Sequence, residues 1–184
     1  MKNSFKYCMP TKIVYKNNAL NDIDKYINGR KTILITSEGT VRRGLVDKLK
    51  LLTVNIVDVI SDVKSHPEFK DLELIYNKIS KIDFELILAV GGGSVLDAAK
   101  YFSVYNKTKS SGFVTDIIKG RIERKDYKTI PIISVPTTAG TSSEITPWAT
   151  IWDLQEKKKY SLHLPELFSE LALYDSSLTL TVPK

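Results

Sequence analysis

Cysteine, histidine and long hydrophobic runs are all scarce in this sequence. Its single cysteine, Cys8, has no partner for an internal disulfide bond, which excludes a disulfide-stapled scaffold. No apolar run approaches the roughly 18 residues needed to span a bilayer, and residues 1–10 lack the apolar core of a secretion signal. We therefore expect a cytoplasmic protein with no membrane partner.

Glycine and proline are also sparse, with 9 and 7 of the 184 residues, which excludes collagen-like and low-complexity chains. The content of 42% hydrophobic and 26% charged residues is typical of a globular protein. The length suffices to bury a sizeable core, and no internal repeat divides it. We expect one domain over residues 1–184.

Acidic residues are outnumbered, because 27 Lys and Arg face 21 Asp and Glu and leave a formal charge of +6. The densest basic stretches, residues 119–128 and 157–159, lack the interleaved aromatic residues and motifs of nucleic-acid-binding surfaces. We interpret both as solvated loops and expect no nucleic-acid partner. A basic RNA-associated domain is the alternative, and it would bind oligonucleotides in a salt-sensitive way.

Apolar runs alternate with segments of helical periodicity along the chain. This alternation predicts an α/β fold with a Rossmann-like parallel sheet and helices on both faces. Asp71 and Ser94 are expected helix N-caps, and the pattern after Glu144 predicts a small β-hairpin. The expected strands are residues 13–15, 32–36, 53–59, 84–90 and 130–135, the hairpin strands 145–152 and 159–164, and the expected helices 19–26, 41–51, 72–80 and 95–105.

The first candidate functional element is the segment VGGGSVLDAAK from Val90 to Lys100, which follows a buried strand and opens a helix. Three successive glycines let the backbone turn tightly and approach a ligand, and the free N–H groups of the helix start favour a phosphate. The segment matches neither the common dinucleotide fingerprint nor a P-loop. Taken alone, it is equally compatible with a tight strand-to-helix turn.

The second element is VPTTAGTSSE from Val135 to Glu144, which follows another buried strand. Its five hydroxyl side chains offer donors and acceptors to pyrophosphate and ribose oxygens, at the strand end where open α/β sheets bind ligands. A Ser/Thr-rich turn by itself is often only a capped loop, and Glu144 would serve there as a cap or bridge. Two such elements, each ending an apolar strand, favour a nucleotide site.

These segments, GGGSVLDAAK at 91–100 and PTTAGTSSE at 136–144, resemble the iron-containing (group III) alcohol dehydrogenases, relatives of lactaldehyde reductase, glycerol dehydrogenase and dehydroquinate synthase. The opening PTKIVYKNNAL and the closing LALYDSSLTLTVP extend the resemblance over nearly the whole chain. The resemblance implies a dehydroquinate synthase-like N-terminal domain that binds a nicotinamide dinucleotide. It also implies hydride transfer to or from a small alcohol or aldehyde.

The resemblance further implies which residues hold the cofactor. It assigns the pyrophosphate to the glycine run with Ser94, and it assigns Asp97 to the nicotinamide end. The hydroxyl loop would contact phosphate and the nicotinamide ribose, which Lys159 would also approach. The expected cofactor-binding residues are Ser37, Gly91, Gly92, Gly93, Ser94, Asp97, Thr137, Thr138, Thr141 and Lys159, with no catalytic or metal-ligating residue in this chain.

Cofactor choice stays open between NAD and NADP. Where the family often has an acidic residue that binds the adenosine ribose, this chain has Ser37, and Arg42 and Arg43 follow one turn later. Glycines usual in the family are also replaced, by Asn18 in the opening turn, where Asn tolerates a left-handed backbone, and by Ser142 in the hydroxyl loop.

Two tryptophans and two histidines complete the candidates. The pair Pro147-Trp148 resembles the phosphonoacetaldehyde reductases of the family, and positions 148, 150 and 152 share one face of a strand. His66 and His163 are isolated, and we interpret them as surface or hydrogen-bonded residues rather than metal ligands. Cys8, without a nearby His or acid, is expected to be a half-buried structural thiol.

The family's metal, iron or zinc, is bound by an Asp and three His in a helical C-terminal domain. We expect that domain to be absent and this chain to be the cofactor-binding half, inactive alone, so that a divalent metal belongs to the full-length enzyme only. The alternative is a non-catalytic nucleotide-binding or interaction module of the same fold. The sequence leaves the oligomeric state open, a homodimer included.

Overall fold

The computed structural model describes residues 8–106 and 110–180. Its centre is a six-stranded sheet in the order β1-β10-β7-β4-β2-β3, in which every neighbouring pair is parallel. The strands are β1 (Lys12–Tyr15), β2 (Thr32–Ile35), β3 (Ile56–Ile60), β4 (Leu86–Gly91), β7 (Ile132–Pro136) and β10 (Leu171–Tyr174). The predicted parallel sheet is therefore confirmed.

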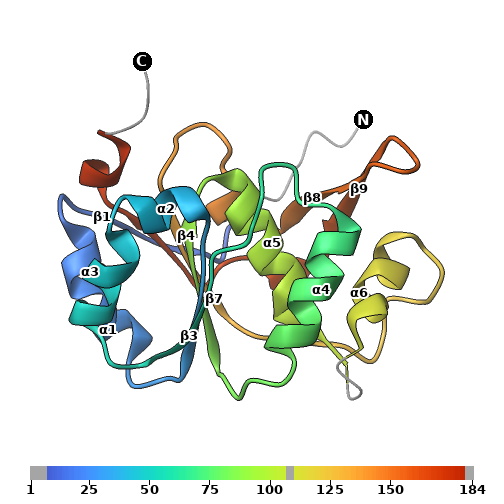
Figure 1. The fold of residues 1–184 in the computed structure, drawn as a ribbon, viewed down its shortest axis with the longest axis horizontal. Helices are drawn as coiled ribbons and strands as arrows, with labels where there is room; N and C mark the ends of the chain where they lie inside the picture. Colours follow the sequence, from blue (N-terminus) through green and yellow to red (C-terminus); the bar gives the residue numbers. More distant parts are fainter. Residues whose placement is uncertain (1–7, 107–109, 181–184) are drawn as a thin grey trace, which may run out of the picture.

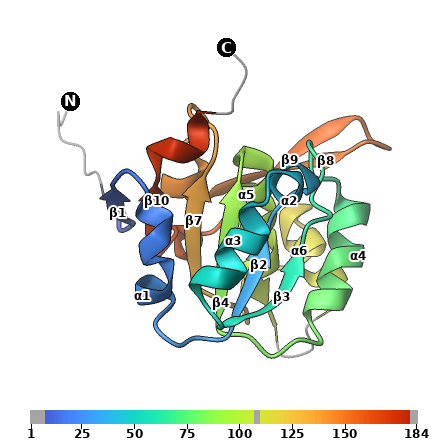
Figure 2. The same cartoon turned by 60° about the vertical axis from the view of Figure 1, so that its left-hand side comes forward.

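Helices cover both faces of this sheet (Figures 1 and 2). Successive strand side chains point to opposite faces, so in β2 Leu34 belongs to one buried cluster while Ile33 and Ile35 belong to the other. The first cluster packs under η1 (Ala19–Asp22), α1 (Ile23–Ile27) and α3 (Leu45–Leu52). The second packs under α4 (Phe69–Ile79), α5 (Gly93–Ser103) and α6 (Ser111–Ile118). This double coverage explains why the central strands read as continuous apolar runs.

The predicted hairpin is formed by β8 (Trp148–Asp153) and β9 (Lys158–His163), which pair antiparallel. In β8 Ala149 and Ile151 are buried, whereas Trp148 and Thr150 are exposed and Trp152 is half-buried. The expected shared face of positions 148, 150 and 152 is thus confirmed. A second small ladder, β5 (Val104–Tyr105) with β6 (Lys128–Thr129), was not expected from the sequence.

The strand order reverses next to β2 and β4, because the chain runs outward from β2 to β3 but runs from β4 towards β7 on the other side. Ligands of open α/β sheets bind outside the carboxyl ends of the strands at such a reversal. The carboxyl ends of β2 and β4 are joined by the Thr36 hydroxyl, which donates a hydrogen bond to the carbonyl of Val90 at 2.7 Å. In Figure 1 this edge of the sheet is uppermost, with α2 (Glu38–Arg42) and the hairpin beside it.

Several boundaries differ from the expectation. Helices α4 and α5 begin at Phe69 and Gly93, so Asp71 and Ser94 lie inside the first turns and the N-cap assignments were wrong. Asp71 pairs instead with Lys64, at 2.8 Å. The helix expected over 41–51 is divided into α2 and α3, because Gly44 between them has a left-handed backbone with φ of +71°.

Other local expectations have mixed outcomes. Asn18 has φ of +57°, so it does take the left-handed conformation that a glycine would otherwise supply. Ser142, which stands for a family glycine, has φ of +53°. Cys8 is exposed rather than half-buried, since it precedes the first strand at the edge of the sheet. Among the residues described, no helix is long and apolar enough to cross a bilayer.

Candidate nucleotide-binding site

The glycine turn (residues 91–93) and the hydroxyl loop (residues 135–144) lie against each other at the carboxyl ends of β4 and β7. An ideal Cβ on Gly92 would lie 3.2 Å from Thr138 Oγ1, and one on Gly93 would lie 2.9 Å from Thr141 Cγ2. The Thr137 amide donates to the carbonyl of Gly91 at 3.0 Å, which continues the pairing of the two strands. A side chain at Gly93 would force Thr141 to shift, and one at Gly92 would crowd Thr138, so the two bends form one surface.

Backbone amides of this surface are available to an anion. Helix α5 begins at Gly93, and the first N–H groups of a helix have no acceptor inside the helix. The amides of Val95 and Leu96 turn back to the carbonyl of Gly92 at 3.0 and 3.2 Å, so those of Gly93 and Ser94 lie at the open start of the helix. The positive end of the helix dipole acts there too. This geometry suits a phosphate group.

A cavity of about 340 Å³ opens beside the start of α5. Asp97 lies in its wall, where the carboxylate accepts hydrogen bonds from the Ser143 hydroxyl at 2.5 Å and from the Thr150 amide at 2.9 Å. The lining residues are Pro67, Gly93, Ser94, Asp97, Thr141, Ser143, Thr146, Trp148, Thr150 and Trp152. The cavity therefore joins the phosphate-binding amides to an aromatic wall that suits a flat ring.

Lys159 does not line this cavity but contacts Trp152, which does. Its side chain is exposed, and its Nζ lies 4.3 Å from the centre of the Trp152 ring. Trp148 stacks face to face on His163 with ring centres 3.9 Å apart, and the rings of His66 and Trp152 are nearly perpendicular with centres 4.8 Å apart. Each histidine thus packs on a tryptophan. In the described part of the chain no three His, Cys, Asp or Glu side chains are grouped so as to hold a metal ion.

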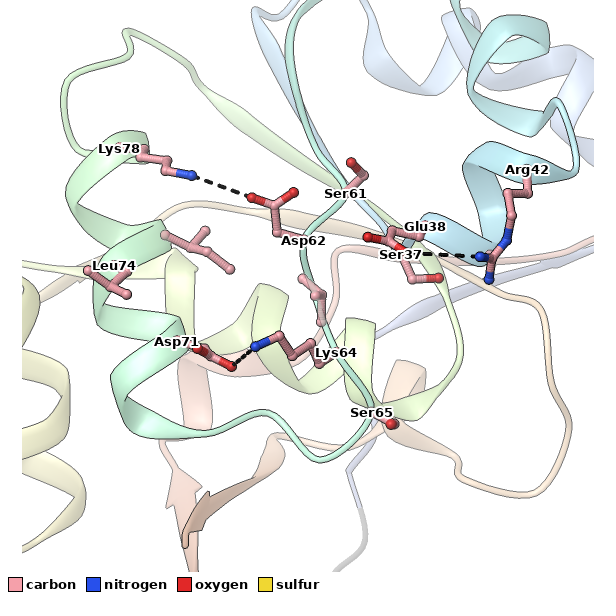
Figure 3. Close-up of a pocket in the computed structure, with 13 residues that line it drawn as sticks. Ser37, Glu38, Arg42, Ser61, Asp62, Lys64, Ser65, Asp71, Leu74 and Lys78 are labelled. Carbon is pink, nitrogen blue, oxygen red and sulfur yellow. Dashed lines mark hydrogen bonds and ion pairs between the residues drawn. The ribbon is translucent and has the colours of Figure 1, made fainter. Parts of the chain in front are cut away.

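A larger cavity, of about 740 Å³, lies outside the ends of β2 and β3 and contains Ser37 (Figure 3). Ser37 is the residue before α2 and forms an isolated bridge with Asp62. Three basic and three acidic side chains line the cavity in pairs: Arg42 with Glu38 at 4.0 Å, Lys64 with Asp71 at 2.8 Å and Lys78 with Asp62 at 3.4 Å. Its charges are therefore balanced, and Arg43, expected beside Ser37, is not among the lining residues.

On the far side of the hydroxyl loop, a cavity of about 450 Å³ contains Thr138 and Glu144. Glu144 is only 6% exposed, and its carboxylate accepts a hydrogen bond from the Tyr174 hydroxyl at 2.8 Å. Burial, together with this bond, raises the pKa of Tyr174. Glu144 thus bridges the hydroxyl loop to β10, in the structural role expected for it.

Most of the predicted cofactor-binding residues converge, but not all of them are equally placed. Six of them surround the junction of the two bends. Ser37 lies one strand away, and Lys159 lies over the Trp152 ring. Thr137 is 5% exposed, and its amide already donates to the carbonyl of Gly91. The six are Gly92, Gly93, Ser94, Asp97, Thr138 and Thr141. Gly91 lies beneath them, where an added Cβ would meet Val95 Cγ2 at 2.6 Å.

Sequence reasoning missed Lys100, which is buried behind this site. It is 1% exposed, and its Nζ bonds the Ser143 hydroxyl and the carbonyl of Trp148. Burial lowers the pKa of Lys100 to about 8, although Asp97 and Glu144 act to raise it. A single charged residue on the apolar face of a helix, between Ala99 and Tyr101, was the available signal.

The basic stretch 119–128 is exposed at most of its positions. Lys119 pairs with Asp153 and Glu156 at 2.5 and 3.0 Å, and Arg121 pairs with Asp116 at 3.2 Å. These cations are largely neutralised by neighbouring carboxylates. The positive charge of this segment is therefore partly offset by acidic neighbours.

The fold and the junction of the bends define an open, doubly wound α/β domain with a candidate ligand site at the carboxyl ends of its strands. The model of the family described as iron-containing alcohol dehydrogenase matches residues 10–176. The chain belongs to that family.

Two curated relatives illustrate the similarity. The NADH-dependent butanol dehydrogenase B of Clostridium acetobutylicum is 28% identical over 187 residues, which cover 97% of this chain and 46% of that protein. The NADPH-dependent butanol dehydrogenase of Clostridium saccharobutylicum is 30% identical over 194 residues, with coverages of 97% and 46%. The chain spans about half the length of these relatives.

Among solved structures, the sulfoacetaldehyde reductase of Bifidobacterium kashiwanohense in complex with NAD+ superposes with a TM-score of 0.83 and 26% identity. The superposition covers 98% of this chain and 48% of that protein. The similarity confirms that the fold is that of the N-terminal domain of iron-containing alcohol dehydrogenases.

Proposed function

We propose that this chain binds a nicotinamide dinucleotide across the glycine turn and the hydroxyl loop, as the cofactor-binding domain of a metal-dependent alcohol dehydrogenase or aldehyde reductase. One observation carries the proposal: Gly92 and Gly93 touch Thr138 and Thr141 so closely that a Cβ on either would meet them at 3.2 or 2.9 Å. Such a surface lets phosphate oxygens reach the amides of Gly93 and Ser94.

The remaining site residues take roles along an extended dinucleotide. The pyrophosphate lies on the start of α5, the nicotinamide enters the cavity of about 340 Å³ beside Asp97, and the adenosine ribose lies towards Ser37. Thr138 and Thr141 supply hydroxyl contacts, and Lys159 approaches the ribose from the hairpin. A bound cofactor supplies the hydride chemistry, while these residues bind and orient it.

The titration that tests this proposal uses a probe already present in the protein. The chain has two tryptophans, Trp148 and Trp152, and both line the cavity of about 340 Å³. Addition of NADH or NADPH should quench their emission in a saturable way. A folded protein whose emission falls no more than that of free tryptophan at the same NADH and NADPH concentrations would refute the proposal. Binding without any alcohol-dependent reduction of NAD or NADP favours the alternative function, a non-catalytic nucleotide-binding module.

Hydride transfer itself is proposed to need metal ligands from outside residues 1–184. In this sequence the family's set of three histidines has no counterpart, because only His66 and His163 occur and each packs on a tryptophan. The assay adds ferrous iron or zinc to the chain with NAD or NADP and a short alcohol, and turnover with the metal would overturn the proposed inactivity of the isolated chain.

Selection between NAD and NADP is proposed to rest on Ser37. A carboxylate at this position would repel the 2′-phosphate, whereas serine does not, and the cavity of Figure 3 contains exposed ion pairs that a phosphate can displace at little cost. Ser37→Asp should weaken NADPH binding roughly tenfold or more and leave NADH binding nearly unchanged. Ser37→Asn is the matched neutral control. Equal NADPH affinity in both variants would contradict this role.

A further inference from the structure

Lys100 lies behind the wall of the candidate nicotinamide cavity, with almost no access to solvent. Its side chain projects from the buried face of α5 and is 1% exposed. An isolated ammonium group in such a position is strongly unfavourable unless it is paired and hydrogen-bonded. The neighbours of Lys100 therefore show what compensates its charge.

Hydrogen bonds from Lys100 connect three separate segments. Its Nζ donates to the Ser143 hydroxyl, in the hydroxyl loop, at 3.0 Å and to the carbonyl of Trp148, at the start of β8. Ser143 in turn donates to the carboxylate of Asp97, one turn earlier on α5, and the other Asp97 oxygen accepts from the Thr150 amide at 2.9 Å. The helix, the loop and the hairpin are thus joined through one buried polar network.

The network also balances charge. Asp97 from α5 lies 4.0 Å from Lys100 Nζ, and Glu144 from η2 (Ser143–Ile145) acts on it over a longer distance. From β8 the carbonyl of Trp148 faces it. With Lys100 protonated the three groups sum to one negative charge, and with Lys100 neutral they sum to two. A dinucleotide is itself an anion, so the protonated network is the better neighbour for it.

We infer that Lys100 is a positioning residue for the nicotinamide end of the site: its ammonium group fixes Ser143, Asp97 and Trp148 in the cavity wall and offsets two carboxylates behind it. The inference rests on the proposed function, because it assigns a cofactor end to that cavity. Lys100 itself does not line the cavity. It acts through Asp97, Ser143 and Trp148, which do.

The test compares the wild-type chain with Lys100→Met and Lys100→Arg, and uses Lys50→Met, at an exposed position of α3, as the matched control. NADH affinity is measured by tryptophan quenching between about pH 6 and about pH 10, a range that brackets the pKa of about 8. At pH 7 Lys100→Met should bind NADH about tenfold more weakly or worse, because charged hydrogen bonds are lost. Lys50→Met should bind as the wild type does.

The pH profile separates positioning from simple packing. Wild-type affinity should fall as the pH rises through about 8, Lys100→Met should show no such step, and Lys100→Arg should keep a larger share of the pH 7 affinity without the step. A ligand-free measurement, the tryptophan emission against pH, should show the same transition in the wild type and lose it in Lys100→Met. This second measurement does not depend on whether the dinucleotide binds.

The possible results are distinguishable. Wild-type NADH affinity and an unchanged pH profile in folded Lys100→Met would overturn the role of Lys100 while leaving the proposed function intact. An emission transition near pH 8 without any NADH binding in the wild type would support the buried network and refute the proposed function, and with it the assignment to the nicotinamide end. Absence of that transition in the wild type, together with wild-type emission and wild-type NADH affinity in Lys100→Met, would overturn the inference.

Discussion

Replacement of Gly93 tests the contact between the two bends most directly. An ideal Cβ at this position would lie 2.9 Å from Thr141 Cγ2 and 3.1 Å from Thr141 Cβ, so even alanine forces a shift of the hydroxyl loop. The backbone of Gly93 is not left-handed, so the effect comes from crowding rather than from strain in φ. Overpacking of this kind costs about 1–3 kcal/mol of unfolding free energy, and valine should cost more than alanine.

The effect on cofactor binding should exceed the effect on folding. A side chain at Gly93 keeps a phosphate away from the amides of Gly93 and Ser94, and each charge-assisted hydrogen bond is worth about 1.5–3 kcal/mol. Loss of one bond raises the Kd for NADH about tenfold or more, and loss of both abolishes binding at accessible concentrations. We expect Gly93→Ala to fall in the first class and Gly93→Val in the second.

The assay is a fluorescence titration with NADH, accompanied by urea unfolding of each variant. Gly112→Ala is the matched control, because a Cβ at Gly112 in α6 meets no atom within 4 Å. That variant should bind NADH normally and gain up to about 1 kcal/mol of stability, since alanine favours helices over glycine. Wild-type NADH affinity in a folded Gly93→Val protein would refute the phosphate-binding surface.

Three further predictions concern how residues around the site affect the unfolding free energy of the protein. Ser142→Gly should raise the unfolding free energy in urea by up to about 1 kcal/mol, because Ser142 has φ of +53°, and a decrease would contradict strain at this turn. Asp175→Asn should lower the unfolding free energy by about 2 kcal/mol at pH 7, because the carboxylate accepts from the amides of Asn18, Leu20 and Ser177. Burial alone would raise the pKa of Asp175, but these hydrogen bonds and the one from the Ser177 hydroxyl lower that pKa overall. The ionised carboxylate therefore stabilises the fold above about pH 4, and this stabilisation is lost on further acidification. Urea unfolding from about pH 7 down to about pH 2 should therefore show the wild type and Asp175→Asn converging, and a constant difference would contradict this. Burial lowers the pKa of Lys100 from 10.5 to about 8, which corresponds to a cost of about 3 kcal/mol for the charged form. The unfolding free energy of the wild type relative to Lys100→Met should therefore rise as the pH increases from about 8 to 10.5. A fall over this range would contradict the burial of the ammonium group.

Local sequence patterns determined the sheet and the two bends. The central strands are apolar along their whole length because both faces of the sheet are covered, so the runs at 32–36, 84–90 and 130–135 were visible without coordinates. The glycine turn and the left-handed Asn18 were also predictable, because few residue types fit those backbone conformations. The start of α5 was predicted two residues too late, with Ser94 as N-cap, because serine is the commoner capping residue, whereas the structure places Gly92 at that position.

Only the tertiary structure decided which of the candidate residues meet. The distance between Gly93 and Thr141 depends on the pairing of β4 with β7, which joins residues 45 positions apart in sequence. The role of Lys100 depends on Ser143 and Trp148, which reach it from a loop and a hairpin, and no local pattern encodes that meeting. Residue types and periodicity fix short-range conformation, whereas the burial of a charge and the closure of a site arise from contacts between distant segments.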